Sequence, residues 1–374
     1  MSYFPGHPPS FFLKQVKNLT SLIPVLYSAD HLLHQPEFEF DRGTQIPYQE
    51  VARRIESTRE ALLKLPNTLE VNPQLNLTSD LIAQVHSPDL ITHLINSSEA
   101  ARLQSLSSNA KENLYLYPWI FPLNQRMRTG LIKSPDPTGC FSFDTYSPIG
   151  SGTWQAVLAS ANLAYYAAQL VASEKYKLAY ALCRPPGHHA AKDMFGGYCY
   201  LNNAAIAARQ LNQTMGRGVI LDIDYHHGNG TQDIFWDDPD VFFISLHADP
   251  VDEYPFFSGY ADERGGESAM GTNLNLPLHK GCDDQSYLQA LDLALGAIRQ
   301  FNPHWLVLSA GYDTCAADPS TFFGLNDDVY SVVGNRIGEL QLPVVIIHEG
   351  GYAVEHNGIL AARLLQGIID SLNE

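Results

Sequence analysis

The sequence predicts an α/β protein in which a mainly parallel sheet lies between layers of helices. Short apolar runs of strand length recur along the chain, and most lie next to longer segments whose apolar residues have helical spacing. Strands that alternate with helices form parallel sheets covered on both faces. Polar, reactive residues directly follow several of the runs, and ligand sites in such sheets form at these carboxyl ends of the strands.

The expected elements follow from these patterns in chain order. Residues 23–27 form a first apolar segment, and buried parallel strands, which read as continuous apolar runs, are expected at residues 177–183, 218–221, 241–246, 305–309 and 343–347. Helical spacing predicts helices at residues 49–65, 153–172, 202–215, 284–300, 327–340 and 359–372.

The domain organisation is predicted to be simple. Residues 1–22 contain several prolines and are expected to form an irregular leader, with residues 23–374 as a single domain, since large α/β sheets often exceed the usual domain length. The stretch 116–152 is rich in proline, glycine and aromatic residues and is expected to be irregular. Loops of that length are usually functional or form an interface.

The composition excludes several classes of protein. With 45% hydrophobic and 17% charged residues, the chain is typical of a globular protein. Its net charge of −17 argues against non-specific binding to nucleic acid and favours a cationic partner. The five cysteines are widely spaced and indicate neither a disulfide framework nor a cysteine metal site. Because we find no signal peptide and no run of about 18 apolar residues, we expect a soluble, cytoplasmic protein without a membrane partner.

Two aspartates and a histidine alternate directly after one expected strand. Alternate residues of an extended segment point the same way, so Asp222, Asp224 and His226 share a face, while His227 is expected to pack away from it. Asp313, at the end of another strand, is the natural third ligand for a metal bound by Asp224 and His226. Such a set leaves a position open for water, as in catalytic zinc sites. Ligand type favours zinc, although Fe²⁺ accepts the same groups, and a hydrogen-bonded Asp-His pair is the alternative.

Two adjacent histidines follow a third expected strand. A Pro-Pro-Gly turn stiffens the chain before His188 and His189 and so determines where their imidazoles project. Beside a metal-activated water they would act as general base and then general acid, with Asp222 and Asn229 setting tautomer and pKa. Tyr352 follows two glycines after the last strand and is a candidate donor to an oxyanion. Together these groups predict a metal-assisted amide hydrolase.

In this order, the segments resemble those of the arginase-like metal-dependent deacetylases, the superfamily of histone deacetylases and acetylpolyamine amidohydrolases. The resemblance covers roughly residues 23–365 and implies an arginase-like three-layer fold with a single deacetylase catalytic domain. The roles that it implies are catalysis by His188, His189 and Tyr352, zinc binding by Asp224, His226 and Asp313, and support of the two histidines by Asp222 and Asn229.

The resemblance has three further implications. Asn229 stands where many class I histone deacetylases have aspartate, and this neutral partner is consistent with a lowered pKa of His189 and its use as general base. True arginases need a carboxylate two residues after the histidine for a second manganese ion, and Gly228 stands there, so guanidine hydrolysis is disfavoured. A structural potassium ion is implied at Asp222, Asp224, His226, Ser245 and Leu246.

Within the superfamily, the N-terminal segment looks more like acetylpolyamine amidohydrolases than histone deacetylases. Glu39 stands where that family has an acidic residue at the mouth of the active site that selects a cationic polyamine, although a solvated loop charge is the alternative. Gly197, Tyr198 and Tyr254 match substrate-binding positions that flank the acyl chain, while both tyrosines also suit a core. The proline-rich stretch falls where these relatives have an insertion that helps form a dimer, so a homodimer is implied.

We therefore predict a zinc-dependent deacetylase that removes acetyl groups from small acetylated polyamines or related amines. The alternative substrate is N-acetyl-lysine in proteins, which a wide, exposed mouth would favour. A non-catalytic, metal-containing binding module is the alternative from another class, and the complete set of core residues counts against it.

Overall fold

The computed structural model describes residues 22–107, 114–133 and 138–372. The expected leader, residues 1–22, therefore lies outside the described residues except for its last one. Within the described ranges no helix is both long and apolar enough to cross a membrane.

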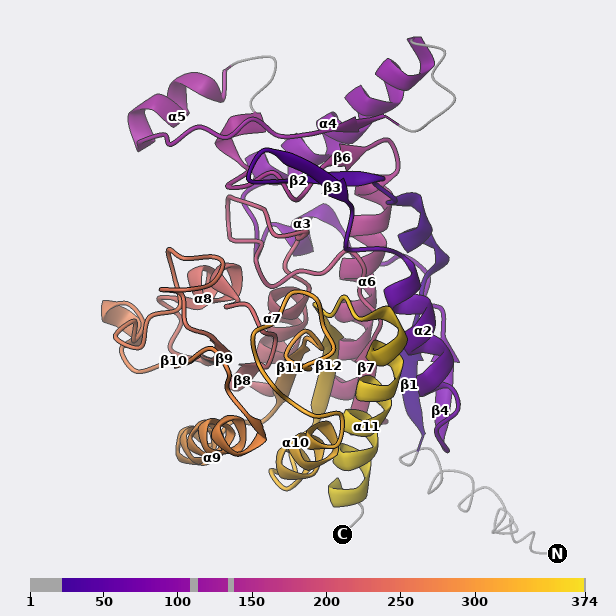
Figure 1. Ribbon diagram of the computed structural model, residues 1–374, viewed down its shortest axis with the longest axis vertical. Coiled ribbons are helices and arrows are strands. Elements are labelled where there is room, and N and C mark those ends of the chain that lie inside the picture. The colour runs from indigo at the N-terminus through magenta and orange to yellow at the C-terminus, as the bar shows by residue number, and fades with distance from the viewer. Residues whose placement is uncertain (1–21, 108–113, 134–137, 373–374) are drawn as a thin grey trace, which may run out of the picture.

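An eight-stranded sheet forms the centre of the molecule (Figure 1). All neighbouring strands pair in parallel, and each expected strand is present, so the predicted α/β architecture is confirmed. Across the sheet the order is β10 (Asn273–Leu278), β9 (Val241–Ala248), β8 (Gly218–Asp222), β11 (Leu306–Ala310), β12 (Val344–His348), β7 (Leu178–Ala181), β1 (Ile23–Leu26) and β4 (Thr68–Val71).

Within this sheet the sequence patterns did not predict β4 and β10, and these two strands are its edges. Each is only partly buried, and polar residues interrupt its apolar pattern, as in the sequence Asn-Leu-Asn-Leu-Pro-Leu of β10. Edge strands tolerate polar residues and proline because one side makes no ladder hydrogen bonds. A continuous apolar run is therefore a signal for central strands alone.

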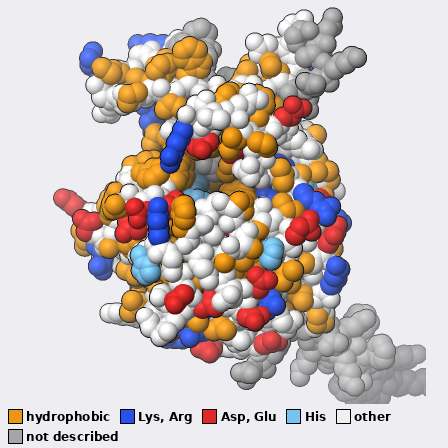
Figure 2. Space-filling view, in the orientation of Figure 1, with side chains coloured by type: hydrophobic (Ala, Val, Ile, Leu, Met, Phe, Trp, Pro, Cys, Tyr) orange, Lys and Arg blue, Asp and Glu red, His pale blue; other side chains and the backbone are white. Residues whose placement is uncertain are grey.

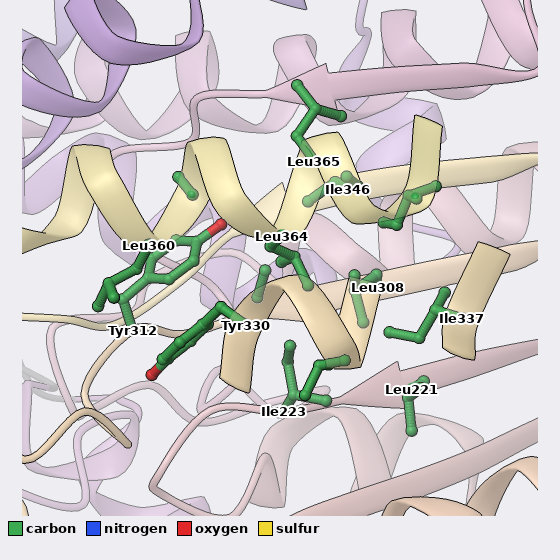
Figure 3. Close-up of a cluster of buried hydrophobic side chains, with 14 of the residues drawn as sticks. Leu221, Ile223, Leu308, Tyr312, Tyr330, Ile337, Ile346, Leu360, Leu364 and Leu365 are labelled. Carbon is green, nitrogen blue, oxygen red and sulfur yellow. The ribbon is translucent and has the colours of Figure 1, made fainter. Parts of the chain in front are cut away.

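Helices cover both faces of the sheet and give three layers. One face is covered by α2 (Arg53–Leu62), α9 (Asp284–Phe301), α10 (Val329–Gly338) and α11 (Val354–Leu372). Figure 3 shows this core, where leucines of α11 and Ile337 of α10 pack on Leu221, Leu308 and Ile346 of the strands. The opposite face is covered by α4 (Pro88–Ser107), α6 (Thr153–Ala172) and α7 (Asn203–Met215).

The helices expected from periodicity are all present, with shifts of a few residues at their ends. The largest shift is in α11, which begins at Val354 rather than at residue 359. The patterns did not predict α4, whose apolar face is weak, or the short helices α3 (Ser79–Ile82), α8 (Asn229–Phe235), η2 (Ala29–Leu33) and η4 (Glu267–Ala269).

The expectation that residues 116–152 are irregular was wrong in part. Within this stretch lie the helices α5 (Gln125–Leu131) and η3 (Thr138–Cys140), and β5 (Tyr115–Leu116) pairs with β6 (Ile149–Gly150). A seven-residue helix is too short to show periodicity, and α5 is instead stabilised at its start by Asn124, whose side chain accepts a hydrogen bond from the backbone of Met127. Together with the end of α4, α5 projects beyond the sheet, above the hairpin of β2 (Phe38–Asp41) and β3 (Thr44–Pro47) (Figure 1).

Candidate active site

The candidate site lies at the carboxyl ends of four adjacent strands. In the order β8, β11, β12 and β7, these strands are neighbours in the sheet (Figure 1). The chain that leaves each of them carries one group of the predicted residues. Because parallel strands all end at the same edge, segments more than a hundred residues apart in sequence meet there.

Two carboxylates and an imidazole converge at this edge. Nδ1 of His226 lies 3.1 Å from Oδ2 of Asp313 and 3.5 Å from Oδ1 of Asp224. One ligand atom from each of the three residues lies within 4.8 Å of the other two. Both aspartates are fully buried, while the histidine is partly exposed. Two hard oxygen donors and one imidazole, open on one side, suit a single divalent metal with a free coordination position.

The backbone orients both aspartates toward this point. Gly350 donates its N–H to Oδ2 of Asp224 at 2.8 Å, and the N–H of Tyr225 donates to Oδ1 of Asp313 at 3.0 Å. A Cβ at Gly311 would lie 2.1 Å from Oδ2 of Asp224, and one at Gly350 would lie 2.5 Å from Oδ2 of Asp313. Only glycine at both positions lets the strand ends approach the carboxylates so closely.

The pKa values of the two aspartates, Asp224 and Asp313, are shifted in opposite directions by their surroundings. Burial and the charge of Asp224 raise the pKa of Asp313 to about 7. Burial acts in the same direction on Asp224, but the charges of His188 and His226 outweigh it and lower the pKa of that carboxyl. The repulsion between two buried carboxylates is what a bound cation would relieve.

The adjacent histidines have different partners and opposite pKa shifts. Nδ1 of His188 lies 3.0 Å from Oδ2 of Asp222, and Nδ1 of His189 lies 2.7 Å from Oδ1 of Asn229. Burial lowers the pKa of His188, but the charges of Asp224 and Asp222 outweigh it and raise the value to about 10. Burial, followed by the charges of His188 and His226, lowers the pKa of His189 well below its ordinary value. The direction agrees with the predicted lowering, but its main cause is burial, and the hydrogen bond with Asn229 acts in the opposite direction.

The amide of Asn229 also determines which nitrogen of His189 is free. Its Nδ2 donates to the carbonyl oxygen of His189 at 3.3 Å, so its Oδ1 faces the ring and accepts a hydrogen bond from the Nδ1–H group. The lone pair of Nε2 is therefore available toward the pocket. A neutral imidazole with this tautomer is the form that a general base requires.

Tyr352 is held by contacts that the sequence patterns did not indicate. The N–H groups of Tyr352 and of the next residue donate to Oδ2 of Asp318 at 2.5 and 2.8 Å. The guanidinium of Arg54 lies 4.9 Å from the centre of the tyrosine ring and donates to two backbone carbonyls of the Glu-Gly-Gly segment before it. Burial raises the pKa of Tyr352 well above its ordinary value, so the phenol keeps its proton.

A third buried acid, Glu349, connects two of the strand ends. Its Oε2 accepts from the N–H of Gly187 at 2.7 Å and from that of His188 at 3.2 Å, while Ser309 donates to its Oε1 at 3.3 Å. The carboxylate thus ties the end of β12 to the turn before the histidine pair and to β11. Its place directly before Gly-Gly-Tyr was the only sequence signal for it. For Arg54 and Asp318 there was none.

A pocket of about 430 Å³ leads from the surface to these groups, and Figure 2 shows a hollow in the upper half of this face with hydrophobic side chains around it. His189, His226 and Tyr352 line the pocket, which brings the predicted histidine, metal-binding and tyrosine groups to one cavity. Its other lining residues are Glu39, Asp41, Ile46, Gln49, Tyr146, Gly197, Tyr198, Tyr254, Pro319 and Ser320.

Each of the predicted substrate-binding residues lies in the wall of this pocket. Tyr198 donates its hydroxyl to Oε1 of Glu39 at 2.9 Å, and burial raises the pKa of Glu39 to about 7. A Cβ at Gly197 would lie 2.4 Å from the ring of His189, so glycine allows the wall to contact that ring. Tyr254 donates to Oδ2 of Asp144 at 2.6 Å, a buried acid that the sequence patterns did not indicate.

The remaining predicted positions lie beside the site. Ser245 is the register partner of Asp222 in the ladder between β8 and β9, Leu246 follows it, and all three are fully buried. Their proposed part in potassium binding stays a prediction. His227 is buried away from the pocket lining and packs 4.5 Å from the ring of His247, as expected for a packed histidine.

Comparison with known proteins agrees with this arrangement. The model of the histone deacetylase domain matches residues 48–368. Acetylpolyamine amidohydrolase 2 of Pseudomonas aeruginosa is 40% identical over 91% of this chain and 97% of its own length, and acetylpolyamine amidohydrolase 1 of the same species is 42% identical over the same shares. The crystal structure of acetylpolyamine aminohydrolase from Burkholderia pseudomallei has a TM-score of 0.85 at 34% identity and covers 92% of this chain and 98% of its own.

Proposed function

The chain belongs to the histone deacetylase family and is an amidohydrolase of the deacetylase type, and from this we propose that it hydrolyses the acetamide bond of acetylated polyamines. One observation carries the choice of substrate. The pocket that reaches His189, His226 and Tyr352 has the carboxylate of Glu39 in its wall. An acid at that place favours an acetylated amine that carries a second, distal ammonium group.

In this proposal His189 transfers the proton and His188 supplies positive charge. Neutral His189 takes a proton from the attacking water at Nε2, since its Nδ1 proton is engaged by Asn229. The same proton then goes to the leaving nitrogen, which departs as an amine. His188, kept cationic by Asp222 and Asp224, provides positive charge beside the developing oxyanion.

Tyr352 binds the carbonyl oxygen of the acetyl group. Its phenol stays protonated because of burial, and it donates a hydrogen bond that strengthens as negative charge develops on that oxygen. Arg54 and Asp318 act as positioning residues that hold the tyrosine through its ring and its backbone. Without these two contacts the phenol would have to be ordered during the reaction.

Asp224, His226 and Asp313 would hold the metal ion, for which we propose Zn²⁺, with Fe²⁺ as the alternative. Such an ion polarises the acetyl carbonyl and lowers the pKa of water. A structural K⁺ at Asp222, Asp224, His226, Ser245 and Leu246 is part of the same proposal. The described register of β8 and β9 supports it by bringing Ser245 beside Asp222.

We also propose that the protein forms a homodimer through the projecting part of the fold. The exposed side chains there include Leu103, Leu106, Trp119, Phe121 and Met127, and Figure 2 shows hydrophobic side chains gathered on the arm that contains α5. Exposed apolar patches of this kind mark protein contacts. Light scattering at increasing protein concentration tests this, and a monomer throughout would refute it. The cytoplasmic location and the absence of a nucleic-acid or membrane partner stay predictions.

The deciding experiment compares substrates on zinc-loaded protein. Amine release from N-acetylputrescine and acetylspermidine is measured against acetyl-lysine peptides, with Tyr352→Phe as the control for catalysis. A higher kcat/KM on the polyamines supports the proposal. A higher value on the peptides would make the protein a lysine deacetylase that uses the same catalytic groups.

A further inference from the structure

A second group of metal-ligating side chains lies outside the pocket. Cys315 is in the loop that follows β11, Asp327 is at the other end of that loop, and His356 is in the first turn of α11. One ligand atom of each lies within 4.8 Å of the other two. None of the three residues lines the pocket described above. A thiol, a carboxylate and an imidazole are the three side-chain types that zinc prefers.

Two distances within this group are close to those between neighbouring ligands of a tetrahedral site. Sγ of Cys315 lies 3.4 Å from Oδ1 of Asp327, and Nδ1 of His356 lies 3.6 Å from Oδ2 of the same carboxylate. In a tetrahedral zinc site with bonds of about 2.0 to 2.3 Å, neighbouring ligand atoms stand roughly 3.3 to 3.8 Å apart. These two distances end on different oxygens of Asp327, and one ligand atom of each residue lies within 4.8 Å of the other two. We therefore expect rotation of the side chains, without a backbone movement, to bring the three residues to ligand spacing.

Hydrogen bonds do not satisfy all the polar atoms of this group. Among the described residues, Nδ1 of His356 is shielded from solvent and has no hydrogen-bond partner, since 3.6 Å to the carboxylate is too long. Asp327 has no ion pair with lysine or arginine in the same ranges, because Arg363 pairs with its neighbour Asp328. A cation that replaces the thiol proton of Cys315 would satisfy the imidazole and the carboxylate together.

The space for a further ligand is also present. A cavity of about 390 Å³ adjoins the group and is lined by Cys315, Ala316, Ala317, Leu325, Asn326, Asp327, Asp328 and Arg363. Water from this cavity would complete four-fold coordination. The loop is held in shape by its own backbone, since Cys315 and Leu325 form a β-bridge and Ala316 donates to the carbonyl of Leu325 at 2.9 Å.

We propose that Cys315, Asp327 and His356 form a second metal site, selective for zinc or a similar transition metal, that clamps the loop after β11 to the start of α11. This loop also carries Asp313 and Asp318, and the backbone just before α11 carries Tyr352. Binding of a metal at the second site would therefore stabilise the loop after β11 and the start of α11, the two segments that hold Tyr352. The inference does not depend on which acetylated amine is the substrate.

Cobalt gives a direct test, because sulfur ligation has its own spectroscopic signature. The full chain loaded with Co²⁺ is expected to show a thiolate-to-cobalt charge-transfer band in the near ultraviolet, which Asp224, His226 and Asp313 cannot produce. The band should vanish in Cys315→Ser and in His356→Gln. The side chain of His356 is 41% exposed, so its replacement should be tolerated. The band should persist in Cys140→Ser, because Cys140 is a buried cysteine that belongs neither to the second metal site nor to the candidate active site.

Zinc content provides the second measurement. At equal free Zn²⁺, elemental analysis is expected to find about two ions per wild-type chain and about one in His356→Gln, with Zn²⁺ raising the unfolding temperature further in the wild type. Absence of the sulfur band in cobalt-loaded wild type, or a band and metal content unchanged in His356→Gln, would overturn the proposal. Loss of amide hydrolysis alone would bear on the catalytic site instead.

Discussion

The floor and the outer wall of the pocket are built in different ways. The floor is the layer of residues directly behind the pocket lining and consists of His188, Asp222, Asp224 and Asp313, which follow or end parallel strands and are almost completely buried. The wall is formed by side chains such as Tyr146 and by others from the β2–β3 hairpin and from loops outside the central sheet. In the proposed function the regular sheet would therefore set the chemistry, and segments that can change without disturbing the sheet would set the choice of substrate.

The two regions also differ in the partners of their carboxylates. In the floor, the carboxylates of Asp222 and Asp224 are balanced by the histidines beside them. In and behind the wall, three carboxylates accept hydrogen bonds from neutral phenols. The distances are 2.9 Å in Tyr198–Glu39 and 2.8 Å in Tyr146–Asp41, which line the pocket, and 2.6 Å from Tyr254 to Asp144 behind it. Burying negative charge without a cation is unfavourable, so a cationic substrate would supply what the wall lacks.

The largest effect is expected from changing the floor at Asp313. In Asp313→Asn we expect hydrolysis to fall by on the order of a thousandfold or more, because the proposed metal site would lose a charged ligand. The metal-free protein should become more stable at neutral pH, since one of two repelling buried carboxylates is removed. Steady-state kinetics measure the loss of hydrolysis, and calorimetry with and without Zn²⁺ measures the change in stability. A response of the unfolding temperature to Zn²⁺ as large as that of the wild type would contradict the assignment.

A smaller loss is expected from the phenol that lies between floor and wall. In Tyr352→Phe we expect kcat to fall by on the order of 10²- to 10³-fold while KM changes little, because the hydrogen bond forms fully only in the transition state. Steady-state kinetics provide the measurement. Tyr165→Phe, a tyrosine of α6 away from the pocket, serves as the control and should behave as wild type. A change confined to KM would show that Tyr352 only binds substrate.

The pH dependence tests the neutral partner of the general base. In Asn229→Asp the new carboxylate should raise the pKa of His189, which has to be neutral to accept a proton. The acidic limb of the profile of kcat/KM against pH is then expected to move up by about one pH unit, with a roughly tenfold loss below it. Asn96→Asp, on the exposed side of α4, is the matched control. An unmoved limb would mean that another group is the base.

The smallest effect is expected in the wall. Because the pKa of Glu39 is raised to about 7 by burial, this group is neutral below that pH and charged above it. KM for a substrate with a distal ammonium should therefore fall as the pH rises through about 7. In Glu39→Gln that KM should be higher by about fivefold to tenfold at pH 8 and independent of this titration. Exposed Glu60→Gln is the control, and an equal effect on an acetylated amine without the ammonium would refute the charge argument.

The sequence was sufficient for the floor because its signals are local. A buried parallel strand is a continuous apolar run, and the reactive residue stands in the loop that follows that run, as His188 does after β7 and Asp313 after β11. The sequence patterns did not predict β4 and β10, because polar residues interrupt these edge strands. They did not predict α5 and α8, because these helices are short. An apolar pattern with a period of 2.0 or 3.6 residues must repeat several times before it can be recognised in a sequence.

By itself, the sequence determined the class of fold, the strand ends that carry the chemistry and the identities of the groups that meet there. Only the tertiary structure decided how those groups are held. Arg54 reaches the carbonyl of a residue 295 positions away, and Tyr254 donates to Asp144 across 110 positions. Such contacts have no period and no spacing, because they depend on how separate helices and loops pack over one sheet.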